Sequence, residues 1–319
     1  MKFIVTIDVE EDNWGKYSRT DNPVENLKKI IHLQKIFDRY SVRPTYLITY
    51  PVATDPGCIE ILKCILDLGR CEIGTHCHPW NTPPFDEELN EHNTMLSNLP
   101  ESLVLQKLQS LHEIICQNFD VVPVSFRAGR WGFSPSVARC LEKLNYNVDT
   151  SISPFVDWRE YQGVDFSDYP LNAYRFDPND IKKQETAGAL VKVPVTIGYL
   201  EGDPYKSHAI NEKLYSGFFK KMRVHSVVSR LGLFNKIWLS PEHCTAREMI
   251  KISSASLREG ISHLNMTFHS ASLTHGLTPF TRNSAEEKKL FQMIEDYLKY
   301  ISDQKIESST LSQFATNLR

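Results

Sequence analysis

The sequence lacks the features that would assign it to a membrane, a secretion route or a disulfide-stabilised fold. No apolar run approaches the length of about 18 residues that a bilayer-spanning helix needs. The apolar start, residues 1–7, is too short for a signal peptide and runs directly into acidic residues, so we expect a cytoplasmic protein. Seven cysteines are an odd number and include no Cys-x-x-Cys pair, which favours reduced thiols over disulfides or a thiolate zinc site.

An excess of charge of one sign is also missing. The net charge is −3, so no general polyanion-binding surface is expected and nucleic acid is not predicted as a partner. Hydrophobic residues make up 41% and charged residues 24% of the chain, which is ordinary for a globular protein. We find no internal repeat, low-complexity tract or linker, and therefore expect one domain over residues 1–319.

Strand-like and helix-like segments alternate along the chain. Strands are expected at residues 2–7, 44–50, 71–75, 121–126, 148–151, 190–197 and 261–268. Helices are expected at residues 22–40, 59–68, 101–118, 136–144, 245–260 and 283–300. This β-α-β rhythm predicts a parallel α/β architecture. Residues 153–185 are polar and are expected to be irregular, and Pro194 indicates an edge strand or a bulge in its run.

Residues 211–237 form a basic, amphipathic stretch with helical spacing. Phe218, Phe219 and Met222 alternate there with Lys220, Lys221 and other cations. We interpret the stretch as a packed helix with a solvated face. The alternative is peripheral contact with a membrane surface or an anionic lipid carrier, without a transmembrane segment.

Two histidines separated by one residue are the first pointer to chemistry. His76 and His78 follow Gly74 and precede Pro79. In an extended segment their side chains point the same way, and Cys77 points to the opposite face. Two converging imidazoles are half of a zinc or other transition-metal site, although a pair of surface histidines in a Pro-rich loop is the simpler interpretation.

Other expected strands also end in polar residues, as the strand with His76 does. Asp8 and Glu10 end the first strand, Arg127 and Arg130 follow a middle strand, and His269 ends the last strand. In a parallel barrel these ends meet at one mouth. Two imidazoles and one carboxylate are a standard catalytic zinc set, and a second carboxylate and a further histidine can act as base and acid. Each group alone also fits a solvated loop, an ion pair or a core histidine.

At the level of motifs, the chain resembles the NodB-homology polysaccharide deacetylases, carbohydrate esterase family four. The resemblance follows motif order over most of the chain, and the strings involved are residues 6–10, 72–79, 126–131, 148–151 with Asp157-Trp158, and 264–270. The string His76-Cys77-His78-Pro79-Trp80 is similar to a branch associated with surface polysaccharides. The resemblance implies a deformed (β/α)7 barrel.

The resemblance also implies roles for individual residues. Asp8 would be the general base, Arg127 would orient it, and His269 would be the general acid. The metal ligands would be Glu10, His76 and His78. Glu11 and Asp12 are alternatives for the acidic ligand, and His92 is an alternative for one of the histidines.

The predicted function is therefore metal-dependent hydrolysis of a non-peptide C–N bond, with N-deacetylation of an acetamido sugar favoured. We expect a divalent metal, with zinc favoured over cobalt, nickel or iron. Sugar contacts are expected from Trp80, Arg130, Trp131 and Trp158, and the sugar is either free or linked to a lipid or nucleotide carrier. The alternatives are an amidohydrolase-type barrel acting on a small amide, and a catalytically inactive carbohydrate-binding member.

Overall fold

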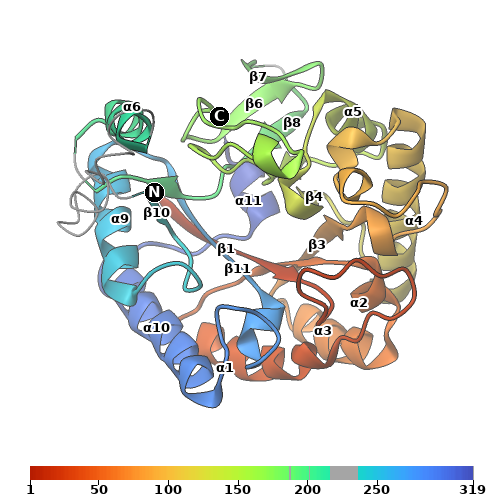
Figure 1. Cartoon of the computed structure of the whole chain (residues 1–319). Helices are drawn as coiled ribbons and strands as arrows, with labels where there is room; N and C mark the ends of the chain where they lie inside the picture. Colours follow the sequence, from red (N-terminus) through yellow and green to blue (C-terminus); the bar gives the residue numbers. More distant parts are fainter. Residues whose placement is uncertain (187, 201, 216–235, 319) are drawn as a thin grey trace.

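The framework of the protein is a curled sheet of parallel strands, seen in a computed structural model that describes residues 1–186, 188–200, 202–215 and 236–318 (Figure 1). Within these residues, seven parallel strands lie side by side in the order β11-β1-β2-β3-β4-β5-β8. Their bounds are β1 Lys2–Val9, β2 Thr45–Ile48, β3 Glu72–Cys77, β4 Ser125–Ala128, β5 Val148–Asp149, β8 Leu190–Lys192 and β11 His263–His269.

Strand β1 lies between β11 and β2 and is almost entirely buried. Positions 3–9 are all buried, as expected of a strand covered on both faces. It pairs with β11 from Lys2 opposite His263 to Asp8 opposite His269, and with β2 on its other side. Asp8 and His269 are therefore neighbours in the sheet.

Helices surround the strands as an outer layer (Figure 1). The α-helices are α1 Ile30–Arg39, α2 Tyr50–Thr54, α3 Pro56–Asp67, α4 Glu101–Phe119, α5 Pro135–Lys143, α6 Pro204–Tyr215, α9 Ala246–Arg258, α10 Ser284–Asp303 and α11 Leu311–Thr316. Short 3-10 helices are η1 Glu25–Lys29, η2 Pro79–Asn81, η3 His92–Thr94, η4 Leu96–Asn98, η5 Gly129–Trp131, η6 Arg159–Tyr161 and η7 Ser270–Leu273.

Side-chain caps fix the starts of three of these helices. Asp55 accepts a hydrogen bond from the Cys58 amide at α3, and Asn283 accepts from two amides at α10. Thr245 and Glu248 form a capping box at α9. Such caps satisfy amide groups that a helix start leaves unpaired, which explains why these helices begin where they do.

Two expectations about the middle of the chain were wrong. Residues 153–185 are not wholly irregular, because β6 Tyr174–Asp177 and β7 Asp180–Gln184 form an antiparallel extension beyond β8. Residues 190–197 are not one strand either. The run divides into β8 and the short β9 Ile197–Gly198, which pairs with β10 Ile237–Trp238. Pro194 lies at the break, where a residue without an amide donor cannot continue the ladder; β8 itself lies between β5 and β6 rather than at an edge.

The gap between β8 and β11 is bridged by single backbone hydrogen bonds. The Thr196 amide donates to the Asn265 carbonyl at 3.1 Å, and the Leu239 amide donates to the Thr196 carbonyl at 2.8 Å. The Thr267 amide in turn donates to the Leu239 carbonyl at 3.2 Å. The sheet thus closes imperfectly at this seam, and the predicted deformed (β/α)7 barrel is confirmed.

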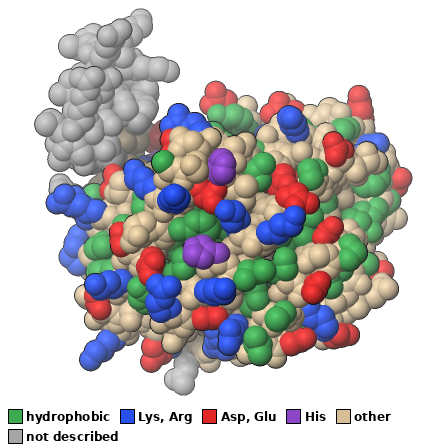
Figure 2. Space-filling view, turned by 90° about the horizontal axis from the view of Figure 1, so that it is seen from below, with side chains coloured by type: hydrophobic (Ala, Val, Ile, Leu, Met, Phe, Trp, Pro, Cys, Tyr) green, Lys and Arg blue, Asp and Glu red, His purple; other side chains and the backbone are tan. Residues whose placement is uncertain are grey.

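The outer surface over α1 and α10 carries mixed charge. Seen from that side, acidic and basic side chains are interspersed (Figure 2). Some of them pair between the two elements, as Arg39 does with Glu295, and Lys29 of η1 pairs with Glu287. Among the described residues, none of the helices has the length and apolar character needed to cross a bilayer. Most of the basic stretch 211–237 lies outside the described residues.

A buried ion pair stabilises the junction of β5 and β8. Lys192 Nζ donates to Asp149 Oδ2 at 2.6 Å, and both side chains are 0% exposed. The ammonium also lies 3.3 Å from the centroid of the Phe133 ring. Burial lowers the pKa of Lys192 to about 8, although Asp149 favours the charged form.

We expect Asp149→Ala to lower the free energy of unfolding by about 3–5 kcal/mol, because it leaves the buried Lys192 charge without a partner. Urea denaturation followed by circular dichroism measures this. The double variant Asp149→Leu with Lys192→Met removes both charges and should be clearly more stable than the single variant. A double variant as unstable as the single one would contradict the explanation.

Candidate active site

The polar strand ends meet at one mouth of the barrel, above a cavity of about 710 Å³. Asp8 belongs to β1 and Glu10 follows it directly; His76 belongs to β3, and His78 follows it. Arg127 lies on β4. The register places His76 beside Arg127, and Asp8 beside His269 of β11. Sequence positions far apart therefore share one cavity, as the sequence predicts.

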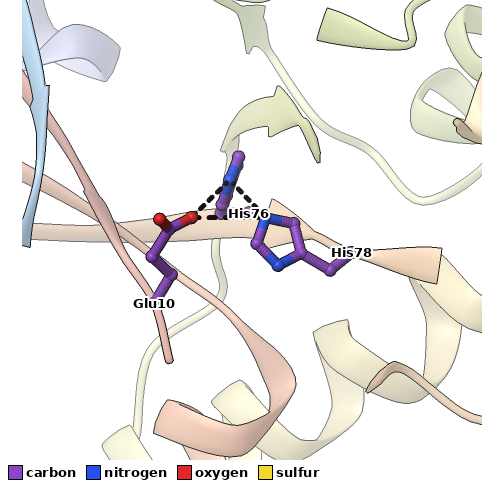
Figure 3. A group of neighbouring side chains, drawn as sticks. All are labelled: Glu10, His76 and His78. Atoms are coloured by element: carbon purple, nitrogen blue, oxygen red, sulfur yellow. Dashed lines mark hydrogen bonds and ion pairs between the residues drawn. The ribbon is translucent and has the colours of Figure 1, made fainter. Parts of the chain in front are cut away.

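Glu10, His76 and His78 converge on one point (Figure 3). The two imidazole Nε2 atoms are 3.0 Å apart, and Glu10 Oε2 lies 3.4 Å from His78 Nε2 and 3.7 Å from His76 Nε2. Tetrahedral ligands with bonds of about 2.0–2.1 Å are about 3.3 Å apart, so these spacings fit one small cation. All three side chains are buried. Burial raises the pKa of Glu10 to about 7, against the attraction of His269 and His78.

The other ring nitrogens of the two histidines are held by hydrogen bonds. His76 Nδ1 contacts the Arg127 carbonyl at 3.1 Å, and His78 Nδ1 contacts Glu11 Oε1 at 2.9 Å. Both acceptors fix Nδ1 as the protonated nitrogen and leave each Nε2 free to bind a metal. Glu11 is an alternative metal ligand in the sequence analysis. In the structure it instead accepts the hydrogen bond from His78 Nδ1.

The remaining alternative ligands lie outside the triad. Asp12 accepts hydrogen bonds from the backbone amides of Glu25 and Asn26. His92 is exposed and contacts Asn93. In the described part of the chain, the group of side chains spaced to hold a metal is the triad alone.

Asp8 is clamped by Arg127. Arg127 Nη1 donates to Asp8 Oδ1 at 2.6 Å, while Asp8 Oδ2 faces His76 Nε2 at 3.9 Å and His269 Nε2 at 3.8 Å. Burial opposes ionisation of Asp8, but Arg127, His76 and His269 together outweigh burial and hold the pKa of Asp8 below its usual value. Asp8 is therefore a carboxylate with one oxygen engaged and the other directed into the cavity.

His269 has a partner that the sequence interpretation missed. Glu242 Oε2 accepts from His269 Nδ1 at 3.0 Å, and Ser272 holds the same carboxylate. Burial lowers the basicity of His269, but Glu242 and Glu10 outweigh it and raise the pKa of His269 to about 10. Little in the sequence indicates that Glu242 belongs to the site. It follows the two-residue strand β10, which is too short to show a periodic pattern.

The segment after His78 is fixed by a buried lysine, which was also missed. Lys107 of α4 is 0% exposed, and its Nζ donates to the carbonyls of Pro79 at 2.9 Å and Thr82 at 2.8 Å. Its charge pairs with Glu87 Oε1 at 3.0 Å. Desolvation lowers the pKa of Lys107 despite this carboxylate. The turn that follows β3 is thus anchored to a helix outside the barrel.

The four residues predicted to contact sugar all line the cavity: Trp80, Arg130, Trp131 and Trp158. Trp80 also stacks on the His78 ring, with centroids 4.1 Å apart, and donates to Glu11 Oε1. Arg130 bonds to Thr94, and Trp131 stacks parallel to Trp158 at 6.3 Å.

Comparison with known proteins gives matches in structure alone. No protein-family model and no curated protein matches the sequence. A Mycobacterium smegmatis protein described as a polysaccharide deacetylase is 16% identical, with a TM-score of 0.57 over 100% of this chain and 90% of that one. A Parabacteroides distasonis protein described as a glycoside hydrolase/deacetylase is 12% identical, with a TM-score of 0.59 over 99% and 70%.

The branching enzyme of glycoside hydrolase family 57 from Thermococcus kodakaraensis is also similar, at 10% identity and a TM-score of 0.54 over 100% of this chain and 71% of that one. At these identities the likeness shows the fold. The chain has the barrel of the polysaccharide deacetylases, so the resemblance stated from the motifs is confirmed at the level of the fold. Because this branching enzyme has a similar barrel, the chemistry must be argued from the site.

Gly129 gives a test of how tightly the metal-ligand geometry is packed. A Cβ at this position would lie 2.5 Å from His78 Cδ2 and 2.7 Å from the Cys77 carbonyl oxygen. We expect Gly129→Ala to displace His78 and to weaken binding of zinc or cobalt by about 10–100-fold, measured by competition with a chromophoric chelator. Gly198→Ala is the matched control, because its nearest neighbour is the flexible tip of Ile252. Equal metal affinity in both variants would contradict the arrangement.

Proposed function

We propose that the protein is a metal-dependent hydrolase that removes the N-acetyl group from an acetamido sugar. The observation that supports this most directly is the buried triad of Glu10, His76 and His78, which lies beside the carboxylate of Asp8 and the imidazole of His269 in one cavity. The reaction breaks the amide C–N bond and forms a C–O bond from water. The products are acetate and a free amino sugar.

Glu10, His76 and His78 would hold the metal. Two imidazole nitrogens and one carboxylate favour zinc, and cobalt, nickel and iron also accept such a set. A divalent ion at such a site lowers the pKa of water and polarises an amide carbonyl. Glu11 and the Arg127 carbonyl would keep the two imidazoles in the binding tautomer.

Asp8 would accept the proton of the attacking water. Its Oδ1 is occupied by Arg127, so its Oδ2, which faces the cavity and both His76 and His269, is the basic atom. The lowered pKa of Asp8 keeps it ionised at neutral pH. Arg127 would act by orientation, because it is buried and bonded to Thr6 and Thr267 on neighbouring strands as well.

His269 would donate a proton to the leaving amine. Its pKa is raised to about 10, since Glu242 and Glu10 outweigh the effect of burial, so the ring is charged at neutral pH. Glu242 holds Nδ1, and Nε2 therefore faces Asp8 and the cavity. A base and an acid that both face the same cavity are the groups that hydrolysis of a polarised amide requires.

The arrangement favours this reaction over the alternatives. Retaining and inverting glycosidases use two carboxyl groups that flank the bond, whereas here Glu10 belongs to the triad and Asp8 is clamped by Arg127. Amidohydrolase-type barrels carry their histidine pair on the first strand. In this chain the acids Asp8 and Glu10 lie at the end of β1, and His76 and His78 lie at the end of β3.

The identity of the sugar and of any lipid or nucleotide carrier remains a prediction. A cytoplasmic location also remains a prediction. Trp131 and Trp158 offer flat apolar faces that suit the C–H face of a sugar ring. A carbohydrate substrate is thus supported by the cavity lining. The alternative is a catalytically inactive protein that binds carbohydrate in the same cavity. Measured turnover would exclude it.

We expect acetate release from N-acetylated sugars to stop after dialysis against a strong chelator and to return with zinc or cobalt. Asp8→Asn should lower kcat by about 10²–10⁴-fold, because it removes the base, with metal binding retained. Acetate is measured by a coupled assay on free, nucleotide-linked and lipid-linked acetamido sugars. Asp21→Asn, an exposed acid nearby, is the control. Full activity of Asp8→Asn, or no metal in the wild-type protein, would refute the mechanism.

A further inference from the structure

His269, the proposed acid, is the most exposed of the proposed catalytic and metal-binding side chains. Its side chain is 24% exposed. The base and the metal ligands are at most 9% exposed: Asp8, Glu10, His76 and His78. An imidazole that is open to the cavity on one side keeps a fixed direction only if contacts on its other sides hold it.

The first of these contacts comes from Glu242. Its two carboxylate oxygens lie 3.2 Å and 3.0 Å from His269 Nδ1, which donates to them. These bonds fix one atom of the ring. The ring can still pivot about that atom, and a pivot would turn Nε2, on the far edge of the imidazole, away from the leaving amine. A contact on the ring itself is needed to prevent this.

Trp14 makes such a contact. The centroids of the Trp14 and His269 rings are 4.7 Å apart, and the ring planes meet at 83°, so the edge of one ring meets the face of the other. Aromatic pairs favour this arrangement. Trp14 lines the cavity and has no role in the function proposed above.

The backbone around Trp14 is fixed by hydrogen bonds. The Trp14 amide donates to the Asp12 carbonyl at 3.0 Å, and the Lys16 amide donates to the Asn13 carbonyl at 2.9 Å. The Asp12 amide donates to the Pro23 carbonyl at 2.7 Å. The turn that presents the indole is thus tied to the chain that leads into η1.

Phe280 supports the same indole. The centroids of the Phe280 and Trp14 rings are 5.4 Å apart, and the ring planes meet at 82°. The next residue, Thr281, donates its hydroxyl to the Ser272 carbonyl at 2.8 Å, and the Ser272 hydroxyl donates to Glu242. The two supports of the acid are therefore connected to each other through η7.

We propose that Trp14 is a positioning residue for the general acid, which holds the His269 ring so that Nε2 points at the leaving amine. The inference rests on the deacetylase function proposed above and adds a residue to its machinery. When the C–N bond breaks, its electron pair remains on nitrogen, and that nitrogen takes the proton from Nε2. Trp14 acts through the imidazole ring and takes no part in the proton transfer itself.

Direct contact with the sugar is the competing interpretation, because Trp14 lines the same cavity as Trp131 and Trp158. The two interpretations differ in whether the effect of Trp14 depends on His269. A positioning residue loses its effect once the acid is removed, whereas a residue that binds the sugar keeps its effect.

The test is a double-mutant cycle on the rate of acetate release. The probes are N-acetylglucosamine and N-acetylgalactosamine, free and linked to uridine diphosphate, and the one that the wild type deacetylates fastest is used throughout. We expect Trp14→Ala to lower kcat by about 10–100-fold and to change KM by less than about twofold, because a misdirected acid protonates the amine poorly.

In the His269→Ala background, Trp14→Ala should lower kcat by less than about twofold. An equal loss in both backgrounds overturns the inference and leaves the deacetylase function standing. No acetate from any of these sugars with the wild-type protein overturns the function, and the inference with it.

Two further variants separate positioning from folding. Trp14→Phe keeps an aromatic ring against His269 and should recover most of the rate. Trp158→Ala is the matched control, because the rings that Trp158 contacts are those of other aromatic residues of the cavity. Its cost should be the same with and without His269. A loss from Trp14→Phe as large as that from Trp14→Ala overturns the inference.

A leaving group that needs no proton gives an independent readout. 4-Nitrophenyl acetate releases a weakly basic phenolate, whose oxygen keeps the electron pair of the broken C–O bond. We expect Trp14→Ala to lower the chelator-sensitive hydrolysis of this ester by less than about twofold, against about tenfold or more for the sugar. Equal losses on both substrates overturn the inference. Weaker zinc binding by Trp14→Ala, measured by competition with a chromophoric chelator, also overturns it.

Discussion

The buried pair of Asp8 and Arg127 is the interaction on which the centre of the barrel depends. Arg127 comes from β4 and reaches Asp8 and Thr6 on β1, Thr267 on β11 and the Thr150 carbonyl after β5. One guanidinium therefore satisfies polar groups from much of the sheet. Replacing Arg127 by an apolar residue would leave the Asp8 carboxylate buried and unpaired, which is among the costliest changes a core can undergo. The same bonds that stabilise the barrel also fix which oxygen of Asp8 faces the cavity.

The sequence was informative about the barrel and about the residues at its mouth for one physical reason. Buried parallel strands are continuous apolar runs, and a polar residue directly after such a run is conspicuous. Asp8, His76 and His269 stand in this position, and the structure brings them together at one end of the sheet. The one-residue spacing of His76 and His78 also fits, because both rings point into the mouth from one extended segment.

What could not be predicted depends on contacts between segments without periodicity. Glu242 follows a strand of two residues, and Lys107 is the only lysine or arginine of α4, at a position between Leu103 and Leu111 on the buried face. A lysine at such a position often extends its ammonium group to water, and only the tertiary structure shows that this one is fully buried. The β6–β7 hairpin was missed because its outer strand alternates one buried residue, Ile181, with exposed polar ones. These positions become meaningful only when the tertiary structure is known.

The Lys107 anchor has a consequence for the order in which the site is assembled. The carbonyls of the turn after His78 surround the ammonium group of Lys107, which belongs to α4. We therefore expect the triad to reach its final geometry only after α4 has packed against the turn and β1 has paired with its neighbouring strands. A cation bound by the triad would have little affinity for folding intermediates that lack this geometry. Its binding energy would therefore stabilise the fully folded barrel against partial opening.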